Sequence, residues 1–179
     1  MTELLIESSG LMNLSHQSDS EQGETRMNSY FGPLVLPYPP SANRYWRHRS
    51  LPRGGIATYV SKDGKVFRET VHKLLRDAGI RSPIAGRVGI DYALYPNRPQ
   101  DYRTRMRKLG EAWHDTVQCI DLDNAQKALL DALKGVAFED DAWVREIVAR
   151  RAEPDGAARL EVRIWAIETE RHQAALELA

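Results

Sequence analysis

Acidic side chains gather in one short stretch of the chain, residues 119–141, which contains five aspartates and one glutamate. Asp121 and Asp123 are two residues apart, and Asp140 and Asp141 follow about one helix later. Adjacent carboxylates repel each other unless a positive charge lies between them. Mg²⁺ prefers oxygen ligands and is commonly held by one or two carboxylates together with a substrate phosphate. The pattern therefore indicates either a magnesium site or an acidic surface that is simply solvated.

The elements around these aspartates must bring them together if they bind a metal. We expect residues 119–123 to form a strand or its end, so that the first two aspartates project to the same side. Asp123 then caps a helix whose apolar residues recur at helical spacing and which ends at Gly135. The start of that helix favours a phosphate, because its free N–H groups and positive dipole end lie there. Asp140 or Asp141 completes the site if the chain folds back after Gly135.

Lys127 lies one helical turn after Asp123, on the same side of the expected helix. An ammonium group there could contact the scissile phosphate or stabilise charge that develops in the transition state. The chemistry implied is metal-assisted hydrolysis, in which Mg²⁺ activates water and clamps the reacting phosphorus. A simpler alternative stays open. In it, Asp123 only caps the helix, Lys127 only pairs with Asp131, and Asp140 and Asp141 lie in a solvated turn.

Basic residues concentrate in the middle of the chain, although its net charge is zero. Residues 44–108 carry sixteen Lys or Arg against five Asp or Glu, whereas residues 109–179 carry eight against fifteen. A basic surface attracts polyanions, and each arginine can neutralise a phosphate. We therefore predict that DNA contacts Arg44, Arg47, Arg49, Arg103, Arg105 and Arg107. The alternative is that these arginines form an ordinary solvated surface.

Two aromatic residues, Tyr45 and Trp46, are interleaved with the first group of arginines. Their rings could stack on an unpaired base of a branched DNA. They could equally pack in the core of the domain. The sequence leaves both possibilities open.

The rest of the sequence predicts one small α/β domain. Helical periodicity favours a helix from Ser61 to about Ala78, and a further helix is possible near residues 104–117. Residues 50–58 predict a loop. Strands are predicted at residues 34–36, 88–94, 143–150 and 159–167. We therefore expect an α/β (α+β-like) fold, with a small mixed sheet of about four strands and two main helices packed on one face.

Composition excludes several classes of protein. No stretch of the 179 residues reaches the roughly 18 apolar residues of a membrane span, and Cys119 has no second cysteine with which to form an intrachain disulfide. Residues 1–29 are polar and acidic, which predicts a disordered segment rather than a secretory signal. Residues 169–179 predict a polar tail. We expect a cytoplasmic protein with one domain at residues 30–168.

Two stretches resemble the RusA family of Holliday junction resolvases. One is LPYPPSANRYWRH at residues 36–48, and the other is DLDNAQKALLDAL from Asp121, followed by EDDAWV. Both occur in the order found in the family, and the resemblance covers about residues 30–168, where it implies a RusA-like nuclease domain. The chain departs from the family pattern at residues 97–120, which insert extra sequence before the aspartates.

The resemblance implies a Mg²⁺-dependent endodeoxyribonuclease that acts as a homodimer and nicks four-way DNA junctions in recombination and repair. Carried over to matching positions, its catalytic carboxylates are Asp121, Asp123 and Asp141, and its essential lysine is Lys127. Asp140 is then a further candidate metal ligand. A two-fold dimer supplies two active sites for two opposed strands. The expected source is bacterial or a prophage.

Two alternatives remain open from the sequence. One is a module that binds branched DNA without cutting it, and the other is a metal nuclease that acts on flap or single-stranded DNA. The full set of carboxylates argues against the first.

Overall fold

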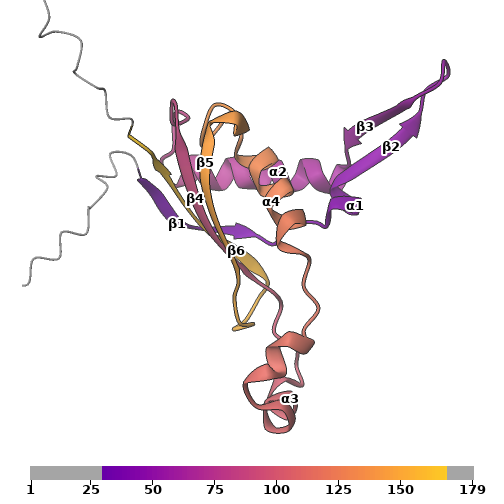
Figure 1. Cartoon of the computed structure of the whole chain (residues 1–179), viewed down its shortest axis with the longest axis vertical. Coiled ribbons are helices and arrows are strands. Elements are labelled where there is room, and N and C mark those ends of the chain that lie inside the picture. Colours follow the sequence, from indigo (N-terminus) through magenta and orange to yellow (C-terminus); the bar gives the residue numbers. More distant parts are fainter. Residues whose placement is uncertain (1–29, 169–179) are drawn as a thin grey trace, which may run out of the picture.

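A four-stranded mixed sheet forms the centre of the molecule, seen in a computed structural model that describes residues 30–168 (Figure 1). The strands lie in the order β1 (Tyr30–Pro37), β6 (Arg159–Ala166), β4 (Val88–Tyr95) and β5 (Val144–Arg151). β6 runs antiparallel to both of its neighbours, whereas β4 and β5 are parallel. The predicted fold class is confirmed. The predictions for residues 1–29 and 169–179 lie outside the described residues.

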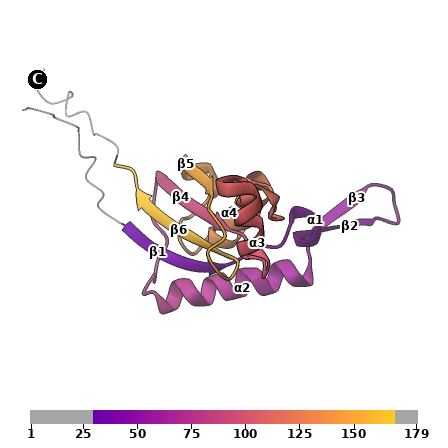
Figure 2. The same ribbon diagram turned by 90° about the horizontal axis from the view of Figure 1, so that it is seen from below.

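Two helices, α2 (Lys62–Asp77) and α4 (Leu122–Leu133), cover one face of this sheet (Figure 2). Apolar residues recur along each helix at intervals of three or four and point into the core. The buried apolar side chains are Phe67, Val71 and Leu75 on α2, and Ala125, Ala128, Leu129, Ala132 and Leu133 on α4. None of the helices within residues 30–168 has the length and apolar character needed to cross a bilayer.

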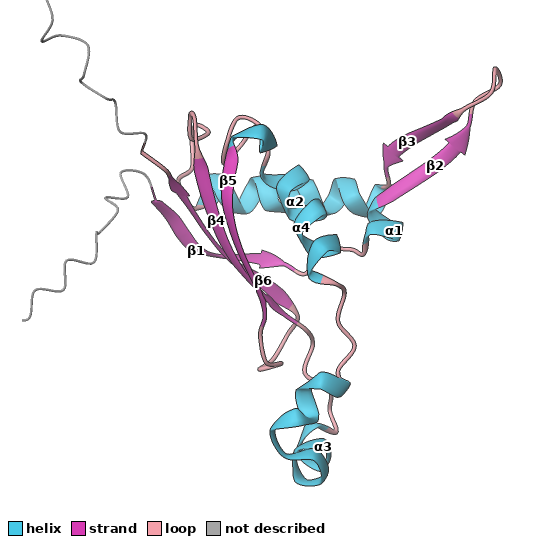
Figure 3. Cartoon of the chain, viewed as in Figure 1, coloured by secondary structure: helices cyan, strands magenta, loops and turns pink. Residues whose placement is uncertain are grey.

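A two-stranded hairpin projects from the domain, separate from the main sheet (Figure 3). It follows the short helix α1 (Ala42–Tyr45) and consists of β2 (Trp46–Ser50) and β3 (Ile56–Val60). The loop predicted at residues 50–58 is therefore wrong in extent, because only residues 51–55 form the turn. Gly54 and Gly55 adopt φ angles of 84° and 95°, which residues with a Cβ rarely adopt.

The inserted residues form a second projection, on another side of the domain from the hairpin (Figure 1). It contains α3 (Tyr102–Leu109) and a 3₁₀ helix, η1 (Gly110–Thr116), where the sequence allowed one helix. Trp113 is buried, and its ring centroid lies 6.1 Å from that of Tyr102. The insertion thus has a small apolar centre of its own.

The segment before α4 differs from the strand predicted at residues 119–123. Residues 117–121 form no regular secondary structure, and Asp121 rather than Asp123 is the N-cap residue of α4. Two features account for the difference. A run of good helix formers begins soon after Asp121, and β4 already has β6 and β5 as neighbours on its two sides.

Leu129→Ala should destabilise the domain, because Leu129 is fully buried between α4 and the sheet. We expect the free energy of unfolding, measured by urea denaturation, to fall by roughly 2–5 kcal/mol. Val66→Ala is the control, because the Val66 side chain on α2 is exposed. It should change the free energy of unfolding by less than about 0.5 kcal/mol. Equal effects of the two substitutions would contradict the assignment of α4 to the core.

Candidate active site

Acidic side chains lie at both ends of α4. Asp121 is the N-cap residue and Asp123 lies in the first turn, and both are exposed. At the other end, the Lys134 Nζ atom lies 2.7 Å from Asp140 Oδ2 and 3.1 Å from Asp141 Oδ1. A helix of 12 residues is about 18 Å long. The two acidic pairs of one chain are therefore separated by the length of the helix.

This separation corrects the prediction that Asp140 or Asp141 folds back onto the Asp121–Asp123 pair. After Gly135, whose N–H donates to the carbonyl of Phe138 at 2.7 Å, the chain turns beside the C-terminal end of α4. The fully buried Phe138 side chain holds this turn in the core. The next residues pass through a short 3₁₀ helix, η2 (Asp141–Trp143), into β5, so the acidic pair stays at that end.

The N-terminal end of α4 combines two carboxylates with a cation. Lys127 Nζ lies 3.3 Å from Asp123 Oδ2, and Asn124 Nδ2 donates to Asp121 Oδ2 at 3.4 Å. The Asp121 side chain makes no capping hydrogen bond to the described backbone. The free N–H groups of the first turn and the Lys127 ammonium suit a phosphate. Asp131 does not pair with Lys127 and instead accepts a hydrogen bond from the Tyr45 hydroxyl.

The C-terminal acidic pair is already neutralised within one chain. The hydrogen bond from Lys134 holds the pKa of Asp140 well below its ordinary value, and the N–H of Ala142 donates to the same carboxylate. Asp140 and Asp141 in turn raise the pKa of Lys134. A metal ion that bound this pair would have to displace the Lys134 ammonium or bind the same carboxylates beside it.

The carboxylates fit Mg²⁺ in type but not in number. Oxygen donors such as Asp121 and Asp123 are the ligands that this ion prefers. Among residues 30–168, however, no group of three or more His, Cys, Asp and Glu side chains is arranged to hold a metal. A third carboxylate at the N-terminal end of α4 would have to come from outside this chain's own α4 region.

Side chains from the sheet position the segment that enters α4, and sequence reasoning missed them. Arg151 Nη2 donates to the carbonyls of His114 and Val117 at 3.0 and 2.6 Å. Tyr92 donates from its hydroxyl to the carbonyl of Leu122. Burial raises the pKa of Tyr92 to about 12, and the negative charge of Asp123 adds to the rise. In the sequence, Tyr92 alternates with Val88, Ile90 and Leu94 on the apolar side of the strand predicted at residues 88–94, which indicates a core residue and gives no signal of this role.

The hairpin places two of the predicted arginines side by side. Arg47 and Arg49 are two residues apart on β2, so they share a face of the hairpin, and both are exposed. Tyr59 lies opposite Arg47 on β3 and belongs to the same face. Arg44, by contrast, forms an exposed ion pair with Asp63 at 2.8 Å. Arg47 and Arg49 therefore form the basic face of the hairpin.

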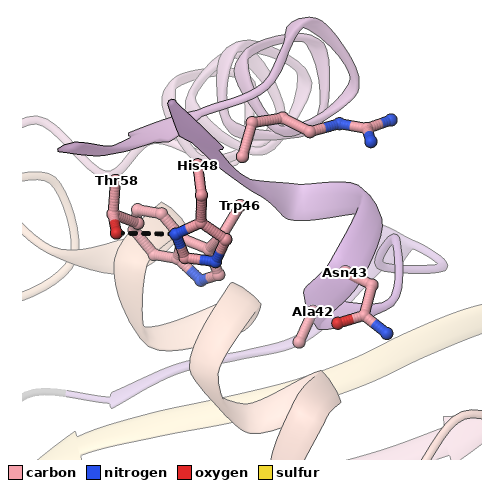
Figure 4. A pocket seen from close by; sticks show the side chains of 6 residues that line it. Ala42, Asn43, Trp46, His48 and Thr58 are labelled. Atoms are coloured by element: carbon pink, nitrogen blue, oxygen red, sulfur yellow. Dashed lines mark hydrogen bonds between the residues drawn. The ribbon is translucent and has the colours of Figure 1, made fainter. Parts of the chain in front are cut away.

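The structure separates the roles of the two aromatic residues. Tyr45 is fully buried, which favours the core alternative for this ring. Trp46 is half-buried and lines an open groove of about 580 Å³ at the base of the hairpin (Figure 4). His48 and Thr58, joined by a 2.9 Å hydrogen bond, lie beside it in the same view. Only Trp46 is therefore placed where it could meet a ligand.

The insertion uses one of its predicted DNA contacts internally. Arg105 donates from Nε to Asp101 at 3.0 Å and from Nη1 to the carbonyl and hydroxyl of Thr116 at 3.1 and 3.0 Å. It thereby ties α3 to the end of η1. Arg103 and Arg107 are exposed on α3 and border a shallow hollow with Met106. These two, rather than Arg105, are the arginines of α3 that suit a phosphate.

Most of the chain is similar to known endodeoxyribonucleases. The family model of the endodeoxyribonuclease RusA matches residues 37–165. The crossover junction endodeoxyribonuclease RusA of Escherichia coli strain K12 is 33% identical over 143 residues, which cover 77% of this chain and 95% of that protein. The protein of the same name from Enterobacteria phage HK97 is 32% identical over 144 residues, covering 80% and 99%.

Arg105→Ala should loosen the insertion, because it removes the bonds that join α3 to Thr116. We expect faster amide hydrogen exchange at residues 102–117, with little change in the main sheet. Arg103→Ala is the matched control, since the Arg103 guanidinium contacts the neighbouring Tyr102 of the same helix, 3.1 Å from its hydroxyl and 5.8 Å from its ring centroid. Unchanged exchange in Arg105→Ala would return Arg105 to the set of candidate DNA contacts.

Proposed function

The chain belongs to the RusA family of endodeoxyribonucleases, and from this premise we propose that it resolves Holliday junctions by paired nicks. The nuclease domain is residues 30–168. The observation that carries the proposal is the exposed N-terminal end of α4, where Asp121 is the N-cap residue and Asp123, in the first turn, lies 3.3 Å from Lys127. Relatives from Escherichia coli and from phages support a bacterial or prophage origin, with action on DNA in the cytoplasm.

The chain's own groups at this end perform two tasks. Asp121 and Asp123 supply oxygen ligands for Mg²⁺, which when bound activates water and neutralises charge on the phosphate. The N–H groups of the first turn and Lys127 orient the phosphate and stabilise the negative charge that develops on its oxygens. Lys127 Nζ lies 3.3 Å from Asp123 Oδ2, which places the ammonium beside a carboxylate that would hold the metal.

We propose that the missing carboxylate comes from a second copy of the chain. In a homodimer whose two α4 helices run in opposite directions, the partner subunit's Asp141 reaches the N-terminal end of α4. The Asp140–Asp141 pair lies at the correct end of the helix for such an exchange. A two-fold axis then creates two identical sites, which matches the two opposed nicks of a resolved junction.

Branched DNA is held in this proposal by the two projections of the domain. Arg47 and Arg49 on the hairpin and Arg103 and Arg107 on α3 contact phosphates. In Figure 1, the hairpin and the insertion extend in different directions from the part of the domain that contains α4, which suits a junction whose arms extend away from the cleavage site. Arg44 contributes less, because Asp63 already neutralises it.

Asp121→Asn should abolish cleavage and preserve binding, because it removes a metal ligand while the arginines remain. We expect the cleavage rate of a four-way junction in Mg²⁺ to fall by at least about 100-fold. The junction Kd in EDTA should stay within about 2-fold. Asp77→Asn, at the exposed end of α2, is the control and should cleave normally.

The same assay separates the rival functions. Wild-type protein that binds junctions but cuts nothing would be a binding module, and faster cutting of flap DNA than of four-way junctions would indicate a flap nuclease. Loss of both binding and cleavage in Asp121→Asn would mean that Asp121 is structural.

Subunit mixing should show whether each active site is shared. Asp121→Asn and Asp141→Asn homodimers should each be inactive. If Asp121 and Asp141 of one site come from different chains, a mixed dimer has one site with both substitutions and one intact site. Mixing the two variants should therefore restore nicking of a single junction strand, observed on a denaturing gel. No recovery in purified mixed dimers would place both residues of a site in the same chain.

A further inference from the structure

The segment that enters α4 depends on side chains for its position. Residues 117–121 form no regular secondary structure. The N–H of Val117 donates to the carbonyl of His114 and the carbonyl of Asp121 accepts from the N–H of Ala125, but the residues between these ends belong to neither helix. Polar backbone groups that are removed from water require partners. Asp121, the last residue of this segment, accepts a hydrogen bond from Asn124 Nδ2 at 3.4 Å but makes no capping hydrogen bond to the described backbone.

Tyr38 holds the backbone on one side of Asp121. Its hydroxyl accepts a hydrogen bond from the N–H of Ile120 at 3.1 Å and donates one to Cys119 Sγ at 3.4 Å. Tyr38 lies between Pro37 and Pro39, whose rings restrict the backbone. The phenol therefore reaches Ile120 from a stiff segment at the end of β1.

Tyr92 holds the backbone on the other side of Asp121. Its hydroxyl donates to the carbonyl of Leu122, the first residue of α4, at 2.8 Å. The Tyr92 side chain is fully buried and belongs to β4, which pairs with a strand on each side. A functional group supported from such a rigid element is held more tightly than one supported from a loop.

We propose that Tyr38 and Tyr92 are positioning residues for the acidic end of α4. Their hydroxyls hold the peptide group between residues 119 and 120 and the one between residues 122 and 123, which bracket Asp121, and thereby help to set the directions of the Asp121 and Asp123 carboxylates. The inference rests on the proposed function, in which these carboxylates hold Mg²⁺. Neither hydroxyl touches substrate in this role, because each is bonded to the protein backbone.

The matched control is a third tyrosine that also contacts α4. Tyr45 is fully buried and donates its hydroxyl to Asp131, on the helix but away from its N-terminal end. Tyr38→Phe, Tyr92→Phe and Tyr45→Phe each remove one oxygen atom and keep the ring. A purely structural role predicts that the three variants lose activity only in proportion to lost stability.

The experiment compares the full-length variants with wild type by single-turnover cleavage of a four-way junction, Mg²⁺ titration, and junction Kd in EDTA. Mg²⁺ binding to the protein alone is measured by calorimetry, and stability by thermal unfolding. We expect Tyr38→Phe and Tyr92→Phe to cleave about 10-fold more slowly, because small misplacements of reacting groups are costly. Both should bind Mg²⁺ more weakly, with junction Kd within about 2-fold of wild type, and Tyr45→Phe should cleave and bind Mg²⁺ as wild type does.

Two results would overturn the inference while leaving the proposed function intact. One is wild-type cleavage and Mg²⁺ binding in both Tyr38→Phe and Tyr92→Phe. The other is an equal loss in Tyr45→Phe that follows its loss of stability. Absence of cleavage by wild type would overturn the proposed function and this inference together. If Tyr92→Phe does not fold, Tyr38→Phe decides, since Tyr38 is only half-buried.

Discussion

The burial of one side of α4 against the sheet is the constraint on which the candidate site depends. Five of its twelve residues, three of them alanines, are buried along the whole length of the helix. Small side chains allow the helix to lie close to its neighbours, and no carboxylate can occupy that stripe without a large desolvation cost. The acidic groups are therefore restricted to the outward side and the two ends. If the reaction needs a third carboxylate at one end of α4, a second copy of the chain is the favoured source of it.

Much of the fold could be predicted because burial leaves a periodic trace in the sequence. The alternation of β4 and β6 and the helical spacing of α2 and α4 each follow from one apolar side facing the core. The start of α4 was harder to predict, since Cys119, Ile120 and Leu122 suit either a strand or a turn into a helix. The expected basis for pairing Asp121 with Asp123 changes with it, because residues two apart share a side in a strand but do not face each other in a helix.

Other features of the site depend on individual side-chain contacts, which leave no periodic pattern in the sequence. Whether Asp141 returns to Asp121 is decided by the turn after Gly135, which a buried Phe138 holds at the far end of the helix. A count of arginines likewise cannot reveal that Arg105 is bonded within the insertion while Arg103 is exposed. The hairpin was missed because its residues are mostly exposed, so it lacks an apolar pattern of its own.

The place of β6 in the sheet has a consequence for how the protein is made. β6 is the last described strand along the chain, yet it lies between β1 and β4 and pairs with both. More than a hundred residues follow β1 before β6, its partner strand, is synthesised. Pairings between strands so distant in the sequence form slowly. A nascent or prematurely terminated chain would therefore lack β6, one of the two inner strands of the sheet. Such a chain cannot complete the sheet against which α4 packs, so we expect DNA cleavage only after β6 has been synthesised.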